Sequence, residues 1–314
     1  PEAADVHFAQ SPVLGDRVVI ARRTDGLVLA YAPDLQREVW RHVCPADHDT
    51  RHTGALSEQT YVFAAGKIVR ALDARSGKLL WEWSAGDAVI YANPAVADGR
   101  VFVGSWSGTF VALDLRSGRE MWSHAQQFKY GHTSPVVVDG NVVMGDRGGH
   151  VRCFDPKNGR VRWEERFGAT GLSTPGHAPG RLLLGFGRSA AQWDLKTGRE
   201  LQPLIGTGSN AFGSPTMVGK NFYFGNLDGH LYAHDAKKGE LLWQFRVPGF
   251  VEVQGRRGAQ GGRGAKGRRR PHAALDFVHT GTRIFASTSN GLYCLVQDPE
   301  KRGKRPFGVT IKPD

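Results

Sequence analysis

Cysteine is scarce in this chain, and long apolar runs are absent from it. Only three cysteines occur among the 314 residues. They are too few and too widely spaced for the disulfide framework of a small secreted domain, so either a reducing cytosol or a periplasm suits the sequence. No run of eighteen apolar residues occurs. The sequence therefore predicts no membrane-spanning helix.

The motifs of several enzyme classes are also missing. The sequence has no P-loop, no glycine fingerprint between a strand and a helix, and no Ser/His/Asp arrangement. His150 and His230 both directly follow a turn glycine, at corresponding places of a repeat. That repetition favours a surface position on a strand over a catalytic pair. We predict no catalytic residue and no bound cofactor.

The N-terminus lacks the features of a signal peptide. The chain begins Pro-Glu-Ala-Ala-Asp, with no initiator methionine, basic region or apolar segment. We expect a processed or trimmed start, which leaves room for a signal peptide or lipid anchor upstream.

The sequence does contain a repeat of about forty residues, the period of propellers and solenoids. Trp40, Trp81, Trp122 and Trp163 are spaced 41 residues apart, and Trp243 lies 80 residues further on. Four of these tryptophans follow a shared phrase, in which a glycine comes four residues after an aspartate and four before the tryptophan. The phrases begin at Asp73, Asp114, Asp155 and Asp235.

The most complete repeat covers residues 134–167. It predicts strands at 136–138, 141–145, 150–154 and 160–163, separated by turns that are rich in Gly, Asn and Asp. Four such strands make an antiparallel meander, which is one propeller blade. Seven repeats can be traced, although the fifth has Gln202 at the tryptophan position and the seventh has lost the whole phrase. We predict an all-β fold: one seven-bladed β-propeller domain of four-stranded antiparallel blades over residues 1–314.

The repeated residues are interpreted as the contacts that hold blades together. An indole at one fixed position can fill the gap between neighbouring blades, burying on the order of 200 Å². The aspartate can cap backbone N–H groups of the turn, and the glycine can adopt a positive φ. We assign this structural blade-docking role to Trp40, Trp81, Trp122, Trp163, Trp243, Asp73, Asp114, Asp155, Asp194 and Asp235.

The positive charge of the chain is concentrated in two segments. Residues 251–271 form an Arg/Gly-rich insertion between the sixth and seventh repeats, and residues 299–314 form a basic C-terminal segment. Glycine spacers without an apolar anchor predict a flexible loop. We predict that this loop contacts an acidic protein partner or a polyanion, with nucleic acid and anionic lipid as alternatives. The partner-binding residues would be Arg256, Arg257, Arg263, Lys266, Arg268, Arg269 and Arg270.

One weak candidate for a metal site precedes the second repeat. Cys44, His48 and His52 are spaced so that they would share one face of a helix, and thiolate with imidazole is a ligand set that suits zinc. Pro45 argues against a helix there, and the segment joins two blades, where a loop is expected. A polar loop is the preferred interpretation, so no metal is predicted.

The phrase Asp-x-x-Ser/Thr-Gly-Lys/Arg-x-x-Trp resembles the repeat of the pyrroloquinoline-quinone-like propeller superfamily. The resemblance covers roughly residues 6 to 297. That superfamily contains quinoprotein dehydrogenases and non-enzymatic propellers such as the BamB-type lipoproteins of outer-membrane assembly. The dehydrogenases typically have a vicinal Cys-Cys pair and calcium-binding carboxylates, and this chain has no such pair. The BamB-type proteins are the better match.

The resemblance implies a non-catalytic protein-interaction scaffold in a multiprotein assembly. It favours the periplasm or the outer membrane as the location, with the cytoplasm as the alternative. Two other functions stay open at this point. One is a quinone- or metal-dependent oxidoreductase, and the other is a ligand-sensing module of a larger protein.

Overall fold

The computed structural model describes most of the repeated body of the chain. The described residues are 12–23, 25–44, 53–131, 133–167, 174–186, 189–201, 205–206, 214–226, 230–246, 276–280, 283–288, 291–296 and 307–311. The chain divides into two compact units, residues 1–170 and residues 171–314. Each unit is described on its own below.

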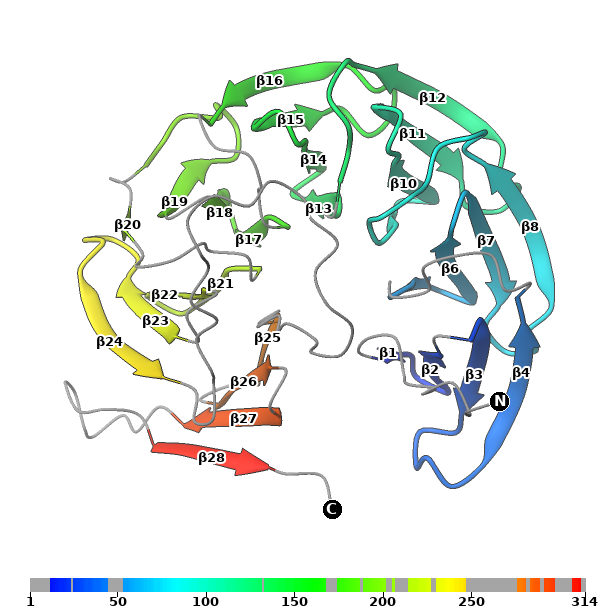
Figure 1. The fold of residues 1–314 in the computed structure, drawn as a ribbon, viewed down its shortest axis with the longest axis horizontal. Coiled ribbons are helices and arrows are strands. Elements are labelled where there is room, and N and C mark those ends of the chain that lie inside the picture. The colour runs from blue at the N-terminus through cyan, green and yellow to red at the C-terminus, as the bar shows by residue number, and fades with distance from the viewer. Residues whose placement is uncertain are drawn as a thin grey trace, which may run out of the picture. The chain divides into compact units, whose positions relative to one another are not determined.

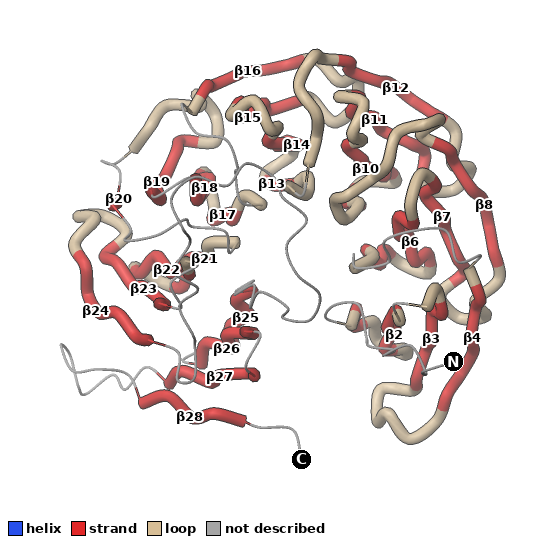
Figure 2. The backbone as a smooth tube through the Cα atoms, in the orientation of Figure 1, coloured by secondary structure: helices blue, strands red, loops and turns tan. Residues whose placement is uncertain are grey.

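The described residues of the first unit form four sheets, each of four antiparallel strands in sequence order (Figures 1 and 2). Their strands are β1 (Val13–Leu14), β2 (Val19–Arg22), β3 (Leu27–Tyr31) and β4 (Glu38–Val43); β5 (Ala55–Ser57), β6 (Thr60–Ala65), β7 (Ile68–Asp73) and β8 (Leu79–Ser84); β9 (Ala95–Ala97), β10 (Arg100–Gly104), β11 (Thr109–Asp114) and β12 (Glu120–Ala125); β13 (Val136–Val138), β14 (Asn141–Gly145), β15 (His150–Phe154) and β16 (Val161–Arg166).

The second unit has three described sheets with the same strand order. Their strands are β17 (Gly176–Ala178), β18 (Arg181–Phe186), β19 (Ser189–Asp194) and β20 (Ile205–Gly206); β21 (Thr216–Val218), β22 (Asn221–Gly225), β23 (His230–Asp235) and β24 (Leu241–Arg246); β25 (Asp276–Thr280), β26 (Arg283–Thr288), β27 (Gly291–Val296) and β28 (Phe307–Ile311).

These sheets confirm the predicted repeat. Residues 134–167 form β13 to β16, and the first three of these strands have the predicted bounds. The fourth runs to Arg166, three residues beyond the predicted end, because its pairing with β15 continues past Trp163. The described residues form seven four-stranded sheets, the number of repeats read from the sequence. That residues 1–314 make a single domain stays a prediction.

Strand position within a sheet decides how each strand is buried. The first strands of neighbouring sheets lie side by side, β1 with β5, β5 with β9 and β9 with β13. The middle strands are nearly continuous in their burial, as in β6 and β11, because adjacent sheets of the first unit cover both faces. The fourth strands, such as β8 and β12, alternate between exposed and more buried positions, since one of their faces meets solvent. Figure 1 shows β4, β8, β12 and β16 along one side of the first unit.

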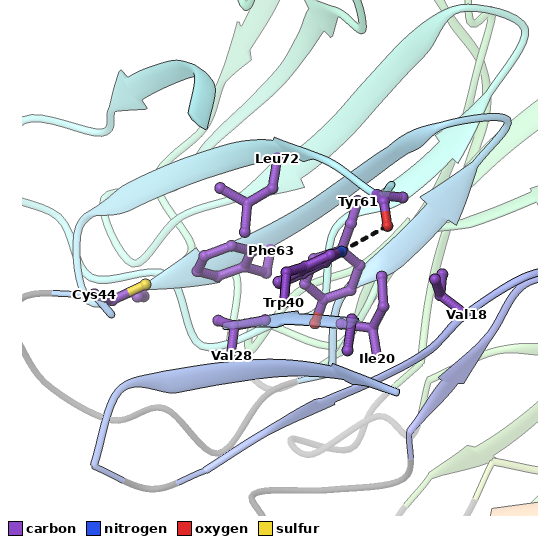
Figure 3. Close-up of a cluster of buried hydrophobic side chains, with 11 residues drawn as sticks. Val18, Ile20, Val28, Trp40, Cys44, Tyr61, Phe63 and Leu72 are labelled. Atoms are coloured by element: carbon purple, nitrogen blue, oxygen red, sulfur yellow. Dashed lines mark hydrogen bonds between the residues drawn. The ribbon is translucent and has the colours of Figure 1, made fainter. Parts of the chain in front are cut away.

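The core of the first unit lies between its sheets. Val28 and Trp40 from the first sheet pack with Tyr61, Phe63 and Leu72 from the second in one buried cluster (Figure 3). Trp81 and Phe110 each belong to a further cluster of buried residues that draws on neighbouring sheets. Each sheet is therefore stabilised by its neighbours, since a lone four-stranded sheet would leave apolar faces in water.

Candidate functional site

The sheets of the first unit have two different edges. We call one the turn edge: it consists of the third-to-fourth-strand turns, residues 32–37, 73–78, 114–119 and 155–160. We call the other the loop edge: it consists of the described residues of the second-to-third-strand turns, within 23–26, 66–67, 105–108 and 146–149, and of the sheet-to-sheet connections, within 85–94 and 126–135. Backbone hydrogen bonds such as Ile90 N–H to Gly66 C=O tie connections to turns on the loop edge.

Near the turn edge, repeated tryptophans join one sheet to the next. The indole N–H of Trp40 donates to the carbonyl of Ala74 at 2.9 Å, and that of Trp81 donates to the carbonyl of Leu115 at 2.8 Å. Trp122 makes the same bond to the carbonyl of Pro156 at 2.9 Å. Each acceptor directly follows the aspartate of the next repeat. The tryptophan thus packs its apolar ring between two sheets and also has a hydrogen-bond acceptor for its N–H group.

The turn glycines in these joints have two functions. Gly77, Gly118 and Gly159 all have a φ of +71°, which favours glycine. A Cβ added to any of the three would lie 2.6 Å from the indole of the preceding sheet. Glycine is therefore required both for the backbone conformation and for the close approach of the ring.

The repeated aspartates cap their own turns. Asp73 Oδ1 accepts from the backbone N–H and the hydroxyl of Ser76, at 2.8 and 2.7 Å. Asp114 accepts in the same way from Ser117, and Asp194 from Thr197. The hydroxyl bond, followed by the backbone bond, lowers the pKa of Asp114 and Asp194 below the ordinary value.

Two of the aspartates use other partners. Asp155 accepts from the guanidinium of Arg162 at 2.8 Å and from the backbone of Lys157, and these bonds lower its pKa. Asp235 accepts from the backbone N–H groups of Lys238 and Lys237, which lower its pKa as well. The two remaining tryptophans lie on the fourth strands β16 and β24. The hydrogen bonds of Asp155 and Asp235 therefore stabilise their own turns, as those of the other repeated aspartates do.

The second unit contains a joint that the sequence did not reveal. The carbonyl of Ala236, which corresponds to Ala74, accepts from the side-chain amide of Gln192 at 2.8 Å. Gln192 lies on β19, not on a fourth strand, and it is 1% exposed. Its side-chain oxygen accepts from Arg181 at 2.9 Å. In the fifth repeat, which lacks the tryptophan, Gln192 on the third strand thus supplies the donor for the carbonyl of the next repeat.

The loop edge of the first unit carries a cluster of aromatic and cationic side chains, which we call the Trp106 cluster: Tyr91, Trp106, Lys129 and Arg147. Lys129 Nζ lies 5.0 Å from the centre of the Trp106 ring, and Arg147 Cζ lies 5.1 Å from it. Tyr91 meets the same indole edge-on, with the ring centres 4.9 Å apart. Trp106 is half-buried, whereas Lys129 and Arg147 are exposed. The sequence reasoning missed this cluster.

Backbone hydrogen bonds hold the members of the Trp106 cluster in place. The N–H of Trp106 donates to the carbonyl of Val89 at 2.8 Å, and the N–H of Arg147 donates to the carbonyl of Lys129 at 3.0 Å. The stem of Arg147 lies over Gly131, where an added Cβ would be 3.0 Å from Cγ and 3.1 Å from Cδ. The connections between sheets are thereby fastened to the turns that carry the side chains.

A buried ionic network stabilises the turn that bears Arg147. The carboxylate of Asp146 is fully buried and accepts from Arg152 Nη1 at 2.6 Å. It also accepts from the backbone N–H groups of Gly148 and His150, at 2.7 and 3.1 Å. Arg152 Nε in turn donates to Glu164 at 2.7 Å. These buried bonds fix the backbone of the turn, so the exposed side chain of Arg147 projects from a well-defined position.

Most of the predicted binding residues lie outside the described part of the chain. These are Arg256, Arg257, Arg263, Lys266, Arg268, Arg269 and Arg270, together with His48 and His52 of the metal candidate. Cys44 is described: it is 2% exposed and belongs to the same buried cluster as Trp40. Burial raises the pKa of its thiol.

Two features are absent from the described residues. No helix with the length and hydropathy of a bilayer-crossing segment occurs among them. No group of three or more His, Cys, Asp or Glu side chains with metal-binding geometry occurs there either.

Comparisons with known proteins place the chain in a family. None of the curated proteins compared with it matches its sequence significantly. Among solved structures, BamB from Moraxella catarrhalis matches with a TM-score of 0.71 and 16% sequence identity, over 94% of this chain and 84% of that one. The computationally designed Ika8 protein matches with a TM-score of 0.66 and 13% identity, over 94% of this chain and 98% of that one. At these identities the matches show the fold.

A family model described as outer membrane protein assembly factor BamB matches residues 24–182, just over half of the chain. These residues include four of the five repeated tryptophans and the whole Trp106 cluster. The predicted β-propeller fold and its pyrroloquinoline-quinone-like repeat are confirmed, and the chain belongs to the BamB family of repeat propellers.

Proposed function

We propose that this protein is a non-catalytic interaction scaffold, which holds protein partners together in a multiprotein assembly. Membership of the BamB family supports this proposal most directly. The described chemistry agrees with it, because the five repeated carboxylates cap turns and three of the five repeated indoles donate a hydrogen bond to the next sheet. What the molecule then presents to partners is a set of loops on a rigid sheet framework, a common arrangement for binding.

We further propose that the Arg/Gly-rich insertion, residues 251–271, contacts an acidic partner. Seven arginines and lysines concentrate positive charge in that insertion. Such a contact is electrostatic, so it weakens steeply as salt rises.

The proposal can be tested by native affinity purification at low salt, with mass spectrometry of the retained proteins. Replacing Arg268, Arg269 and Arg270 by Ala should weaken partner retention and leave the melting temperature nearly unchanged. A control variant, Arg116→Ala/Arg119→Ala/Lys157→Ala, removes the same charge from exposed positions of the turn edge. Equal retention by all three proteins would contradict the role of the insertion. Failure of the wild-type protein to retain any partner would contradict the scaffold function.

A further inference from the structure

We propose that the Trp106 cluster is a docking site for an acidic peptide segment of a partner protein. The inference deepens the proposed scaffold function by assigning one contact surface and the chemistry of what binds there. It concerns Tyr91, Trp106, Lys129 and Arg147, all from the loop edge of the first unit.

Charge distribution on the loop edge singles out this cluster. Other cations of the described loop edge have carboxylate partners: Arg23 pairs with Asp25 at 2.7 Å, and Lys67 pairs with Asp87 at 3.1 Å. Among the described side chains, Lys129 and Arg147 form no ion pair with a carboxylate and lie instead against one indole. An incoming carboxylate can therefore bind both cations without displacing an existing partner.

The geometry of the cluster suits a protein ligand. Arginine binds a carboxylate through two parallel N–H donors, and lysine adds a third donor beside it. The half-buried indole and the edge of Tyr91 offer an apolar surface next to the charges, the combination that dominates protein interfaces. Cation–π contacts and the backbone bonds of Val89 and Lys129 hold the site before binding, which lowers the entropy lost on association.

The same surroundings disfavour an extended polyanion. A nucleic acid backbone requires a row of unpaired cations that follows its phosphates. On the described loop edge the remaining cations, Arg23 and Lys67, are already paired with Asp25 and Asp87, so no such row is available there. A short acidic peptide needs only the two cations of the Trp106 cluster.

The repeat explains how such a site arises in a propeller. Trp106 and Arg147 occupy the same turn position in neighbouring sheets, 41 residues apart. The hydrogen bonds from Trp106 to Val89 and from Arg147 to Lys129 are likewise equivalent. Two adjacent copies of one framework thus present an indole and a guanidinium toward each other.

The test uses the full-length chain and a fluorescein-labelled peptide of alternating Glu and Leu, followed by fluorescence anisotropy at low salt. The Lys129→Gln/Arg147→Gln variant should bind the peptide about tenfold more weakly than wild type, because two exposed charge pairs are lost. The matched control is Arg116→Gln/Arg119→Gln, which removes the same charge from exposed positions of the turn edge. It should bind the peptide as wild type does, and both variants should keep the wild-type melting temperature.

Three results would overturn the inference: no binding of the peptide by the wild-type chain, binding by Lys129→Gln/Arg147→Gln that is as tight as that of wild type, or a loss of affinity as large in the turn-edge control. A labelled oligothymidylate is measured in parallel. The proposal of an acidic peptide as the ligand is wrong if the oligothymidylate binds wild type as tightly as the peptide does and loses affinity in the Lys129→Gln/Arg147→Gln variant. The peptide-binding assay does not depend on partner retention in native purification. A negative result in the assay therefore contradicts the Trp106 docking site without contradicting the scaffold function.

Discussion

At the scale of single residues, the repeated tryptophan is the most informative position in the chain. Its spacing predicted a contact between sheets, and the structure gives that contact a hydrogen-bond acceptor in Ala74, Leu115 and Pro156. The acceptor could not be predicted, because a backbone carbonyl leaves no signature in the side-chain sequence. The bond from Gln192 to Ala236 could not be predicted for the same reason, because a residue outside the motif donates to the backbone carbonyl that recurs in each of these turns.

Trp81→Phe should lower the free energy of unfolding by about 1–3 kcal/mol, because the buried carbonyl of Leu115 loses its donor. Trp83→Phe is the matched control: Trp83 lies on the same strand, is only partly buried, and packs against the cluster that contains Trp81. Chemical denaturation followed by tryptophan fluorescence measures both. A cost for Trp83→Phe as large as that for Trp81→Phe would contradict the importance of the hydrogen bond.

The capped aspartates predict how stability depends on pH. Hydrogen bonds from Ser117 lower the pKa of Asp114 in the folded chain, below the unfolded value of about 3.9. The stabilisation is therefore complete above that value and is lost as pH falls through the folded pKa. Asp114→Asn should melt at a lower temperature than wild type at pH 6, and the difference should shrink below about pH 4. Melting curves from pH 6 to pH 2 test this expectation.

Asp98→Asn serves as the control for the pH series, since Asp98 is exposed in a tight turn of the same sheet. Its melting temperature should follow that of wild type across the whole range. A difference between Asp114→Asn and wild type that does not change with pH would contradict the capping account.

At the scale of strands and turns, the sequence predicted most of what the structure shows. The first three strands of residues 134–167 have the predicted bounds because the turn residues, such as Asp139 and Gly140 with positive φ, mark where strands end. The Trp106 cluster was not predicted, because it forms from two turns and two connections whose proximity depends on how the sheets are placed. One signal was available: Trp106 falls outside the regular tryptophan series and lies in a turn.

Gly118→Ala tests the fit between turn and indole. Gly118 has a φ of +71°, and an added Cβ would lie 2.6 Å from the Trp81 ring. Gly99 has nearly the same φ, +70°, with no atom within 4 Å of an added Cβ. Both substitutions incur the conformational cost of about 1–2 kcal/mol, and Gly118→Ala should add roughly 1–3 kcal/mol from overpacking. Denaturant titrations measure both variants. Equal losses of unfolding free energy in Gly118→Ala and Gly99→Ala would contradict a close contact between the turn and the Trp81 ring.

At the scale of the whole molecule, the family and the fold follow from the repeat, while the partner does not. Repeats record how sheets pack, and the same packing serves propellers with very different functions. The Arg/Gly-rich insertion departs from the repeat, which is why the sequence singled it out. The loop edge of the first unit supplies the described counterpart: a preformed aromatic and cationic surface on a rigid framework.

Site-specific photo-crosslinking in cells that express the full chain tests the central claim, that partners dock on the loop edge of a non-catalytic scaffold. A photoreactive amino acid is placed at Gln127, which is exposed on the loop edge beside Lys129, or at Arg116, which is exposed on the turn edge. The account predicts a discrete protein adduct from position 127, lost in the Lys129→Gln/Arg147→Gln background, and none from position 116. Adducts from position 116 alone, or none from position 127, would contradict it.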